Sequence, residues 1–268
     1  MCLRILIALM LGMLTAAGPG HAADLVTINT PRGVKQGFIL MKPAEPPTAL
    51  VILFAGGHGA LKLTSASTMQ WGAANFLVRS RDFFVARGFL VAVVDAPSDR
   101  PNGMNAIFRM SQAHADDIGA VVRHLKKQVD LPAWLVGTSM GTFSAARAAM
   151  VVGNADGLVL TSTITRARPD WKIAKSHKDG VASMNLSQVT AATLIVSHRR
   201  DACPSTPAAD APKLQRRLVN AKTVEIALLD GGAKPLSAPC QARSQHGFLG
   251  IEQQAVDTIA KFIRTYAK

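Results

Sequence analysis

Apolar and polar residues follow one another in blocks along the chain, and eight of these blocks have the length and composition of β-strands. Two of them, 49–57 and 89–97, are nearly continuous apolar runs, which is typical of strands buried on both faces of a parallel sheet. The expected strands cover 25–30, 33–41, 49–57, 89–97, 133–137, 157–163, 192–197 and 223–230. Because the first two are joined through Pro31-Arg32-Gly33, we expect them to be antiparallel.

Segments with helical spacing of apolar residues separate most of these strands. In 112–129, for example, Ile118, Val121 and Leu125 recur at helical spacing with polar residues between them. The expected helices cover 80–88, 112–129, 143–152, 211–219 and 250–267. Alternating strands and helices predict an α/β fold, in which a mostly parallel eight-stranded sheet has helices on both faces. We expect one domain over 24–268, with a minimal lid at 166–182, where no regular pattern is found.

The first 23 residues differ from the rest and have the order of a secretory signal peptide. Arg4 precedes an apolar run from Ile5 to Ala17, and small residues follow up to Ala22 and Ala23. The run is shorter than the roughly 20 residues that span a bilayer. We therefore expect cleavage after Ala22 or Ala23, a periplasmic or secreted protein, and no transmembrane anchor after the signal peptide is removed.

Composition narrows the classes of partner. The formal net charge is +13, but the basic residues are scattered and aromatic residues make up only 5% of the chain. No segment alternates basic and aromatic residues as a single-strand binder would, so no nucleic acid is expected as a partner. The charge indicates either a solvated basic surface or a weak attraction to anionic envelope surfaces. The sequence contains no HExxH, no phosphate-binding loop and no GxGxxG, so neither a metal nor an organic cofactor is expected.

The motif "GTSMG" contains the most informative serine of the chain. Ser139 lies between Gly137 and Gly141, directly after the expected strand 133–137 and before the expected helix 143–152. A sharp strand-to-helix turn requires small neighbours, exposes the hydroxyl above the sheet edge and directs helix N-terminal amides at an oxyanion. Ser139 is therefore a candidate nucleophile, and the alternative is an ordinary turn serine.

A serine nucleophile needs a base, and the base needs an acid that orients it. On a sheet of this kind both follow the serine at later strand ends, the acid before the histidine. Asp201 follows strand 192–197, and His246 lies between the last strand and the last helix. Asp170, which follows the sixth strand, is the alternative acid.

The other histidines are poorer candidates for the base. His124 lies on a helix, and His114 and His177 are expected at the surface or in the lid. His198 ends the strand before Asp201, where it either lines the site or solvates the loop.

The chain resembles the α/β-hydrolase family over essentially its whole mature length. The matching features are "GTSMG", Asp201, "HGF" at His246 and "FAGG" after the third strand. The resemblance implies that Ser139 is the nucleophile, His246 the general base and then acid, and Asp201 the acid that orients the histidine.

The resemblance also implies two backbone N–H groups that form an oxyanion hole. One would come from Met140 and the other, by its position after the third strand, from Gly57, with His58 as the near alternative. Members of the family often have His-Gly at the end of that strand, whereas here the sequence reads Ala55-Gly56 and the histidine is displaced to His58. His58 is also a candidate for lining the site. Asp95, at the end of strand 89–97, is expected to cap the following turn.

These residues predict an exported serine hydrolase that cleaves a carboxylic ester through an acyl-enzyme on Ser139. Thioesters and amides are alternative substrates, and the ester could belong to a small molecule or a polymer. The alternative functions are a peptidase or amidase of the same fold and a catalytically silent binding protein.

Two cysteines remain once Cys2 is removed with the signal peptide. Cys203 lies two residues after Asp201, and Cys240 lies six residues before His246. In the expected fold these loops leave neighbouring strands at one edge of the sheet. We therefore expect a disulfide that ties the Asp201 loop to the His246 loop, and the alternative is two unpaired, packed cysteines.

Overall fold

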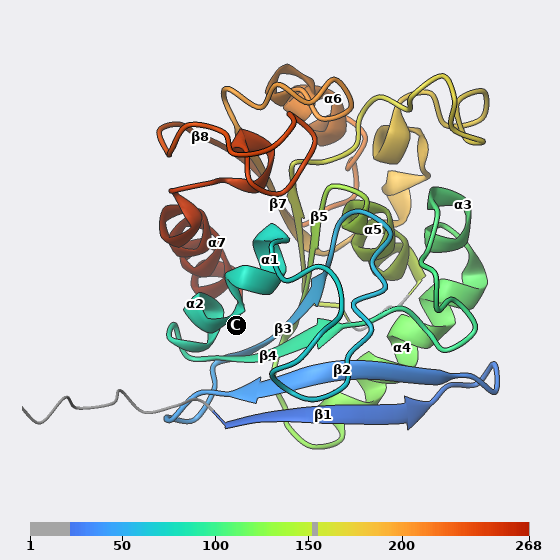
Figure 1. Cartoon of the computed structure of the whole chain (residues 1–268), viewed down its shortest axis with the longest axis vertical. Helices are drawn as coiled ribbons and strands as arrows, with labels where there is room; N and C mark the ends of the chain where they lie inside the picture. The colour runs from blue at the N-terminus through green and yellow to red at the C-terminus, as the bar shows by residue number, and fades with distance from the viewer. Residues whose placement is uncertain (1–21, 152–154, 268) are drawn as a thin grey trace, which may run out of the picture.

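The computed structural model describes residues 22–151 and 155–267, and its centre is a single eight-stranded sheet (Figure 1). The strands are β1 (Ala22–Asn29), β2 (Lys35–Lys42), β3 (Ala49–Phe54), β4 (Phe89–Val94), β5 (Ala133–Thr138), β6 (Gly157–Thr161), β7 (Ala192–His198) and β8 (Val224–Leu229). Their order is β1-β2-β4-β3-β5-β6-β7-β8. β2 is antiparallel to both β1 and β4, and all the other neighbours are parallel. The expected strand positions and mostly parallel sheet are therefore confirmed.

Helices cover both faces of the sheet, as expected. They are α1 (Phe76–Arg79), α2 (Arg81–Val85), α3 (Ala106–Arg109), α4 (Gln112–Lys126), α5 (Gly141–Val151), α6 (Ala211–Gln215) and α7 (Glu252–Tyr266). Alternate residues of the buried strands point to opposite faces. One set packs against α4 and α5, and the other packs against α1, α2 and α7. Helices α2 and α7 lie at the left of the sheet in Figure 1.

Some segments differ from the expectations. Helices α1 and α3 are four-residue turns, too short for a periodic pattern to show. Helix α6 ends at Gln215, and the remainder of 211–219 forms turns. The expected lid, 166–182, inserts Ile173 and Val181 into the core.

The expected signal peptide lies outside the described residues, except that Ala22 and Ala23 begin β1. None of the helices in the described ranges combines the length and the apolar character that crossing a bilayer requires.

Candidate active site

Ser139 occupies a strained turn between β5 and α5. Its φ is +52°, in the left-handed region that side chains other than glycine rarely adopt. The glycines on either side allow this turn because the backbone passes so close: a Cβ added at Gly141 would lie 2.1 Å from the carbonyl oxygen of Phe54, and one at Gly137 would lie 2.5 Å from that of Gly141. The turn has the geometry of a nucleophile held above the sheet edge.

Asp201 and His246 are brought together from loops that follow β7 and β8. Asp201 Oδ2 lies 3.0 Å from His246 Nδ1, and the side chains are 0% and 5% exposed. Asp201 Oδ1 accepts a hydrogen bond of 2.9 Å from the backbone N–H of Cys203, which fixes the carboxylate. With Nδ1 directed at Asp201, the opposite ring nitrogen, Nε2, is left as the group that can exchange a proton with a substrate or a nucleophile.

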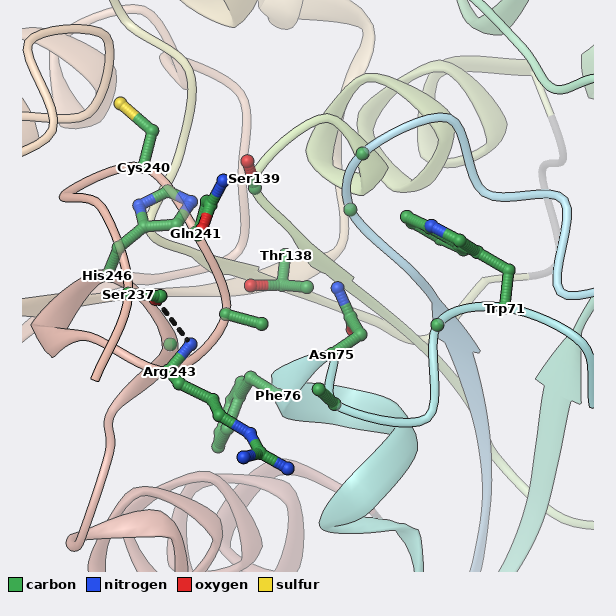
Figure 2. Close-up of a pocket in the computed structure, with 16 residues that line it drawn as sticks. Trp71, Asn75, Phe76, Thr138, Ser139, Ser237, Cys240, Gln241, Arg243 and His246 are labelled. Carbon is green, nitrogen blue, oxygen red and sulfur yellow. Dashed lines mark hydrogen bonds between the residues drawn. The ribbon is translucent and has the colours of Figure 1, made fainter. Parts of the chain in front are cut away.

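Ser139 and His246 line the same pocket (Figure 2). Among the residues that the structure describes, no hydrogen bond joins their side chains. A contact of this kind often tightens only when a substrate binds.

Two further residues support the histidine and carry no signal in the sequence. The hydroxyl of Thr206 lies 2.8 Å from Asp201 Oδ2 and 3.0 Å from His246 Nδ1, so it touches both partners of the pair. The hydroxyl of Ser162 donates a 2.7 Å hydrogen bond to the carbonyl oxygen of His246. Ser162 is fully buried with a φ of +41°, which is a second strained position at this site.

The two expected oxyanion donors have free N–H groups. Within the described ranges, neither the N–H of Met140 nor that of Gly57 has a hydrogen-bond acceptor. The loop after β3 lies against Ser139, since a Cβ added at Gly56 would be 3.0 Å from Ser139 Cβ. Asp95 holds the continuation of this loop: its carboxylate accepts from the N–H groups of 61–63 as well as from the next residue, so it caps more than the turn that follows it.

The pocket that contains Ser139 has a volume of about 450 Å³, and its surface is mainly apolar. Figure 2 shows Trp71 on the side opposite His246, with Phe76 and Arg243 at the lower rim. Its lining residues are Gly56, Gly57, Trp71, Gly72, Ala74, Asn75, Phe76, Thr138, Ser139, Ser237, Cys240, Gln241, Ala242, Arg243, His246 and Gly247. None of the described residues of the expected lid is among them.

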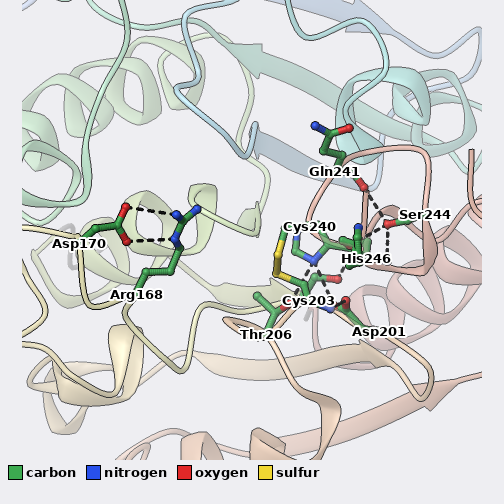
Figure 3. The surroundings of a disulfide bond; sticks show 11 residues. Arg168, Asp170, Asp201, Cys203, Thr206, Cys240, Gln241, Ser244 and His246 are labelled. Carbon is green, nitrogen blue, oxygen red and sulfur yellow. Dashed lines mark hydrogen bonds and ion pairs between the residues drawn. A yellow bond between two sulfur atoms is a disulfide. The ribbon is translucent and has the colours of Figure 1, made fainter. Parts of the chain in front are cut away.

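The expected disulfide joins Cys203 and Cys240 (Figure 3). Cys203 follows Asp201 and is buried, whereas Cys240 lines the pocket. From Cys240 the chain continues to Ser244, whose hydroxyl donates to the carbonyl of Gln241 and accepts from the N–H of His246. The bridge therefore connects the loop of Asp201 to the loop of His246.

Three other expected site residues do not line the pocket. His58 stacks on Trp71 with ring centroids 3.7 Å apart, and burial, together with the charge of Arg109, lowers the pKa of His58. His198 is buried, and its two ring nitrogens bond to the backbone of Arg200 and Gly231. Asp170, the alternative acid, is exposed and pairs with Arg168, as Figure 3 shows.

His114 corrects an expectation. It was expected at the surface or in the lid, but it is 1% exposed and its Nε2 lies 2.9 Å from the hydroxyl of Ser144 on α5. Burial, together with the nearby Arg109 and Arg32, lowers the pKa of His114 to about 3. The sequence pattern did not distinguish a buried polar position on α4 from an exposed one. His177 is partly exposed in the segment 166–182, and His124 lies on α4, as expected.

No protein-family model matches this sequence, and no curated protein matches it either. Solved structures do match. An esterase from Pyrococcus furiosus is 14% identical, with a TM-score of 0.66 over 97% of each chain. A dienelactone hydrolase from Anabaena variabilis is 15% identical, with a TM-score of 0.59 over 92% of this chain and 99% of its own. A carboxyl esterase from Bacillus coagulans is 14% identical, with a TM-score of 0.61 over 91% of this chain and 99% of its own. Together with the sheet topology, these likenesses show that the chain has the α/β-hydrolase fold.

Proposed function

We propose that this protein is an exported serine hydrolase that cleaves carboxylic esters through an acyl-enzyme. The observation that carries the proposal is that a strained serine, Ser139, and a histidine paired with a buried carboxylate, His246 with Asp201, line the same pocket through Ser139 and His246. A catalytically silent binding protein would have no need of this combination of backbone strain and buried charge.

In the proposed reaction, Ser139 Oγ attacks the ester carbonyl while His246 Nε2 takes the hydroxyl proton. Asp201 keeps the imidazole in the required tautomer and stabilises the imidazolium. The N–H groups of Met140 and Gly57 bind the oxyanion of the tetrahedral intermediate. When the intermediate collapses, the C–O bond to the alcohol breaks and His246 returns the proton to the leaving oxygen. Water then hydrolyses the acyl-enzyme by the same steps, with His246 again acting as the base.

The preference for esters is supported by the solved structures of similar fold that are described as esterases, and by the small, mainly apolar pocket. Export is supported by the N-terminal signal pattern and by the Cys203–Cys240 disulfide, since disulfides persist in oxidising compartments. The net charge of +13 supports a weak attraction to anionic envelope surfaces.

The test is labelling with a fluorophosphonate probe, followed by assays with p-nitrophenyl esters of increasing chain length. Thioesters and peptide amides are assayed in parallel. We expect stoichiometric labelling of the oxidised wild-type protein, no labelling of Ser139→Ala, and faster turnover of esters than of amides. An unlabelled, folded wild-type protein would favour the binding protein, and faster amide cleavage would favour the peptidase or amidase.

A further inference from the structure

Arg109 is a buried cation without a carboxylate partner in the described part of the chain. It ends helix α3 and is 1% exposed, and it is among the largest fully buried side chains. Burial alone lowers its pKa, to about 9, so the guanidinium stays charged at neutral pH although its charge is not neutralised nearby. Burying an unpaired charge is unfavourable unless hydrogen bonds compensate for the lost water. Its hydrogen bonds therefore indicate what the residue does.

Those hydrogen bonds connect the two parts of the candidate oxyanion hole. Nη1 donates to the hydroxyl of Ser144 at 2.7 Å, and Ser144 lies on α5, the helix that begins just after the nucleophile. Nη2 donates to the carbonyl oxygens of Ala55 and Gly57, each at 3.2 Å. One planar guanidinium thus bridges the helix that follows Met140 and the loop that contains Gly57.

The loop needs an external restraint because its central peptide joins two glycines. Gly57 has a φ of +57°, and glycine imposes little preference of its own on the backbone. In a trans peptide the carbonyl and the N–H of the next residue point in opposite directions. Fixing the carbonyls of Ala55 and Gly57 fixes the peptides on both sides of the Gly56–Gly57 peptide, whose N–H belongs to Gly57. Holding the two flanking peptides narrows the range of orientations that this N–H can take, although within the described residues no hydrogen bond holds the Gly56–Gly57 peptide itself.

The loop is also shaped around the guanidinium. A Cβ added at Gly59 would lie 2.2 Å from Arg109 Nη2, so the backbone approaches the charge as closely as a glycine allows. On the other side, His114 contacts the same Ser144 hydroxyl that accepts from Arg109. Arg109, Ser144 and His114 form a buried polar chain from the oxyanion loop through α5 to α4.

We infer that Arg109 is a positioning residue of the oxyanion hole, which holds the N–H of Gly57 at a fixed distance from that of Met140. This inference rests on the proposed function, because the oxyanion hole has a role only if Ser139 attacks a carbonyl. Arg109 lines none of the pocket and acts through the backbone of the loop, so its effect belongs to the transition state and not to substrate binding.

The test compares Arg109→Met, Arg109→Lys and the control Arg32→Met. Arg32 lies over Phe108, the residue before Arg109, and pairs with Asp99 and Asp117, so its loss perturbs the same region without touching the loop. For Arg109→Met we expect kcat on p-nitrophenyl acetate to fall about 10- to 100-fold, less than the roughly 10²- to 10³-fold loss when an oxyanion donor is removed. KM should change less than about 3-fold, and the inhibition constant of a trifluoromethyl ketone should rise by the same factor as kcat falls.

Arg109→Lys should recover part of kcat, because an ammonium can reach the carbonyls but lacks the planar fork that also reaches Ser144. Backbone order parameters of Gly56 and Gly57, measured by NMR, should fall in Arg109→Met and stay unchanged in Arg32→Met. If the order parameters of the loop do not change in Arg109→Met, or if kcat falls only in proportion to stability in both the Arg109→Met and Arg32→Met variants, the inference is overturned. If the loop loosens while the wild-type protein shows no Ser139-dependent hydrolysis, the restraint on the loop stands and the proposed function fails.

Discussion

The two sides of the pocket are held in different ways. On the side of the candidate nucleophile, called the nucleophile side below, the backbone itself fixes the geometry: Ser139 lies in a turn between two glycines at which an added Cβ would clash with neighbouring main chain. On the side of the candidate base, called the base side below, Asp201 and His246 project from irregular loops that are linked by a disulfide and by the hydroxyl of Thr206. A short turn can be specified by a few consecutive residues, whereas long loops require contacts between distant parts of the chain.

The largest effects should follow from removing the reacting groups themselves. We expect Ser139→Ala and His246→Ala each to lower kcat about 10⁴- to 10⁶-fold, because members of a triad act as a unit. Hydrolysis of p-nitrophenyl acetate measures the loss, and thermal unfolding checks that each variant is folded. If His246→Ala stayed largely active while Ser139→Ala was inactive, a residue other than His246 would be the general base.

The next effect tests the choice of acid. Asp201→Asn should lower kcat by at most about 10⁴-fold, because the amide no longer fixes the tautomer and orientation of the imidazole. Asp170→Asn is the matched control: its carboxylate is 64% exposed and pairs only with Arg168, so kcat should not change. A silent Asp201→Asn together with an inactive Asp170→Asn would reverse the assignment.

Removing the disulfide tests whether the stability and activity of the protein depend on the cross-link between the Asp201 and His246 loops. The cysteines are 37 residues apart, and chain entropy predicts a loss of about 3–4 kcal/mol in the free energy of unfolding for Cys203→Ser with Cys240→Ser. We also expect a lower kcat or earlier thermal inactivation, since loops whose positions fluctuate do not keep the Asp201–His246 hydrogen bond. Urea unfolding and initial rates measure both effects.

Two outcomes would contradict this view of the disulfide. Mass spectrometry of a non-reduced digest of the exported protein should find the bridged peptide, and two alkylatable thiols would exclude the bond. An unbridged enzyme that matches the wild type in both rate and thermal inactivation would make the bridge incidental to the site.

Most of the fold was predictable because strand and helix periodicities are local properties of the sequence. The strained turn at Ser139 was also predictable, since Gly137 and Gly141 lie only two residues away on either side. Asp201 and His246 could be proposed from their order after strand ends, and the structure brings them within a hydrogen bond of each other.

The supporting residues were not predictable, because their partners are far away in the sequence. Ser162 bonds to the carbonyl of His246, 84 residues away, and Arg109 bonds to Ala55, 54 residues away. Neither residue belongs to a motif, and a serine at a strand end or an arginine on a four-residue helix has no distinguishing pattern. His114 shows the same limit, since its burial depends on Ser144 and Arg109, which only the fold brings close.

The smallest predicted effect is a pH dependence of the free energy of unfolding. It comes from His114, which belongs to the buried chain of Arg109, Ser144 and His114 beside the nucleophile side. The pKa of His114 is lowered to about 3 in the folded protein, against about 6.5 in an unfolded chain, chiefly because burial disfavours the charged imidazolium and also because Arg109 and Arg32 repel it. Below pH 6.5 the unfolded chain therefore binds a proton that the folded protein does not. The stabilising contribution of the neutral imidazole is fully present above pH 6.5 and is lost as the pH falls toward 3.

We expect the free energy of unfolding to fall by about 2 kcal/mol between pH 7 and pH 5 from His114 alone, at about 1.4 kcal/mol for each pH unit below 6.5. Urea unfolding of the oxidised protein at pH 7, 6 and 5 measures this slope. His114→Gln, which can still bond to Ser144 but does not titrate, should remove that part of the slope, whereas His177→Gln, at a partly exposed position, should leave it in place. Parallel slopes for the wild type and His114→Gln would show that the buried chain of Arg109, Ser144 and His114 tolerates a second charge. In that case acid would not weaken the nucleophile side more than the base side, where the Cys203–Cys240 disulfide stays intact over this pH range.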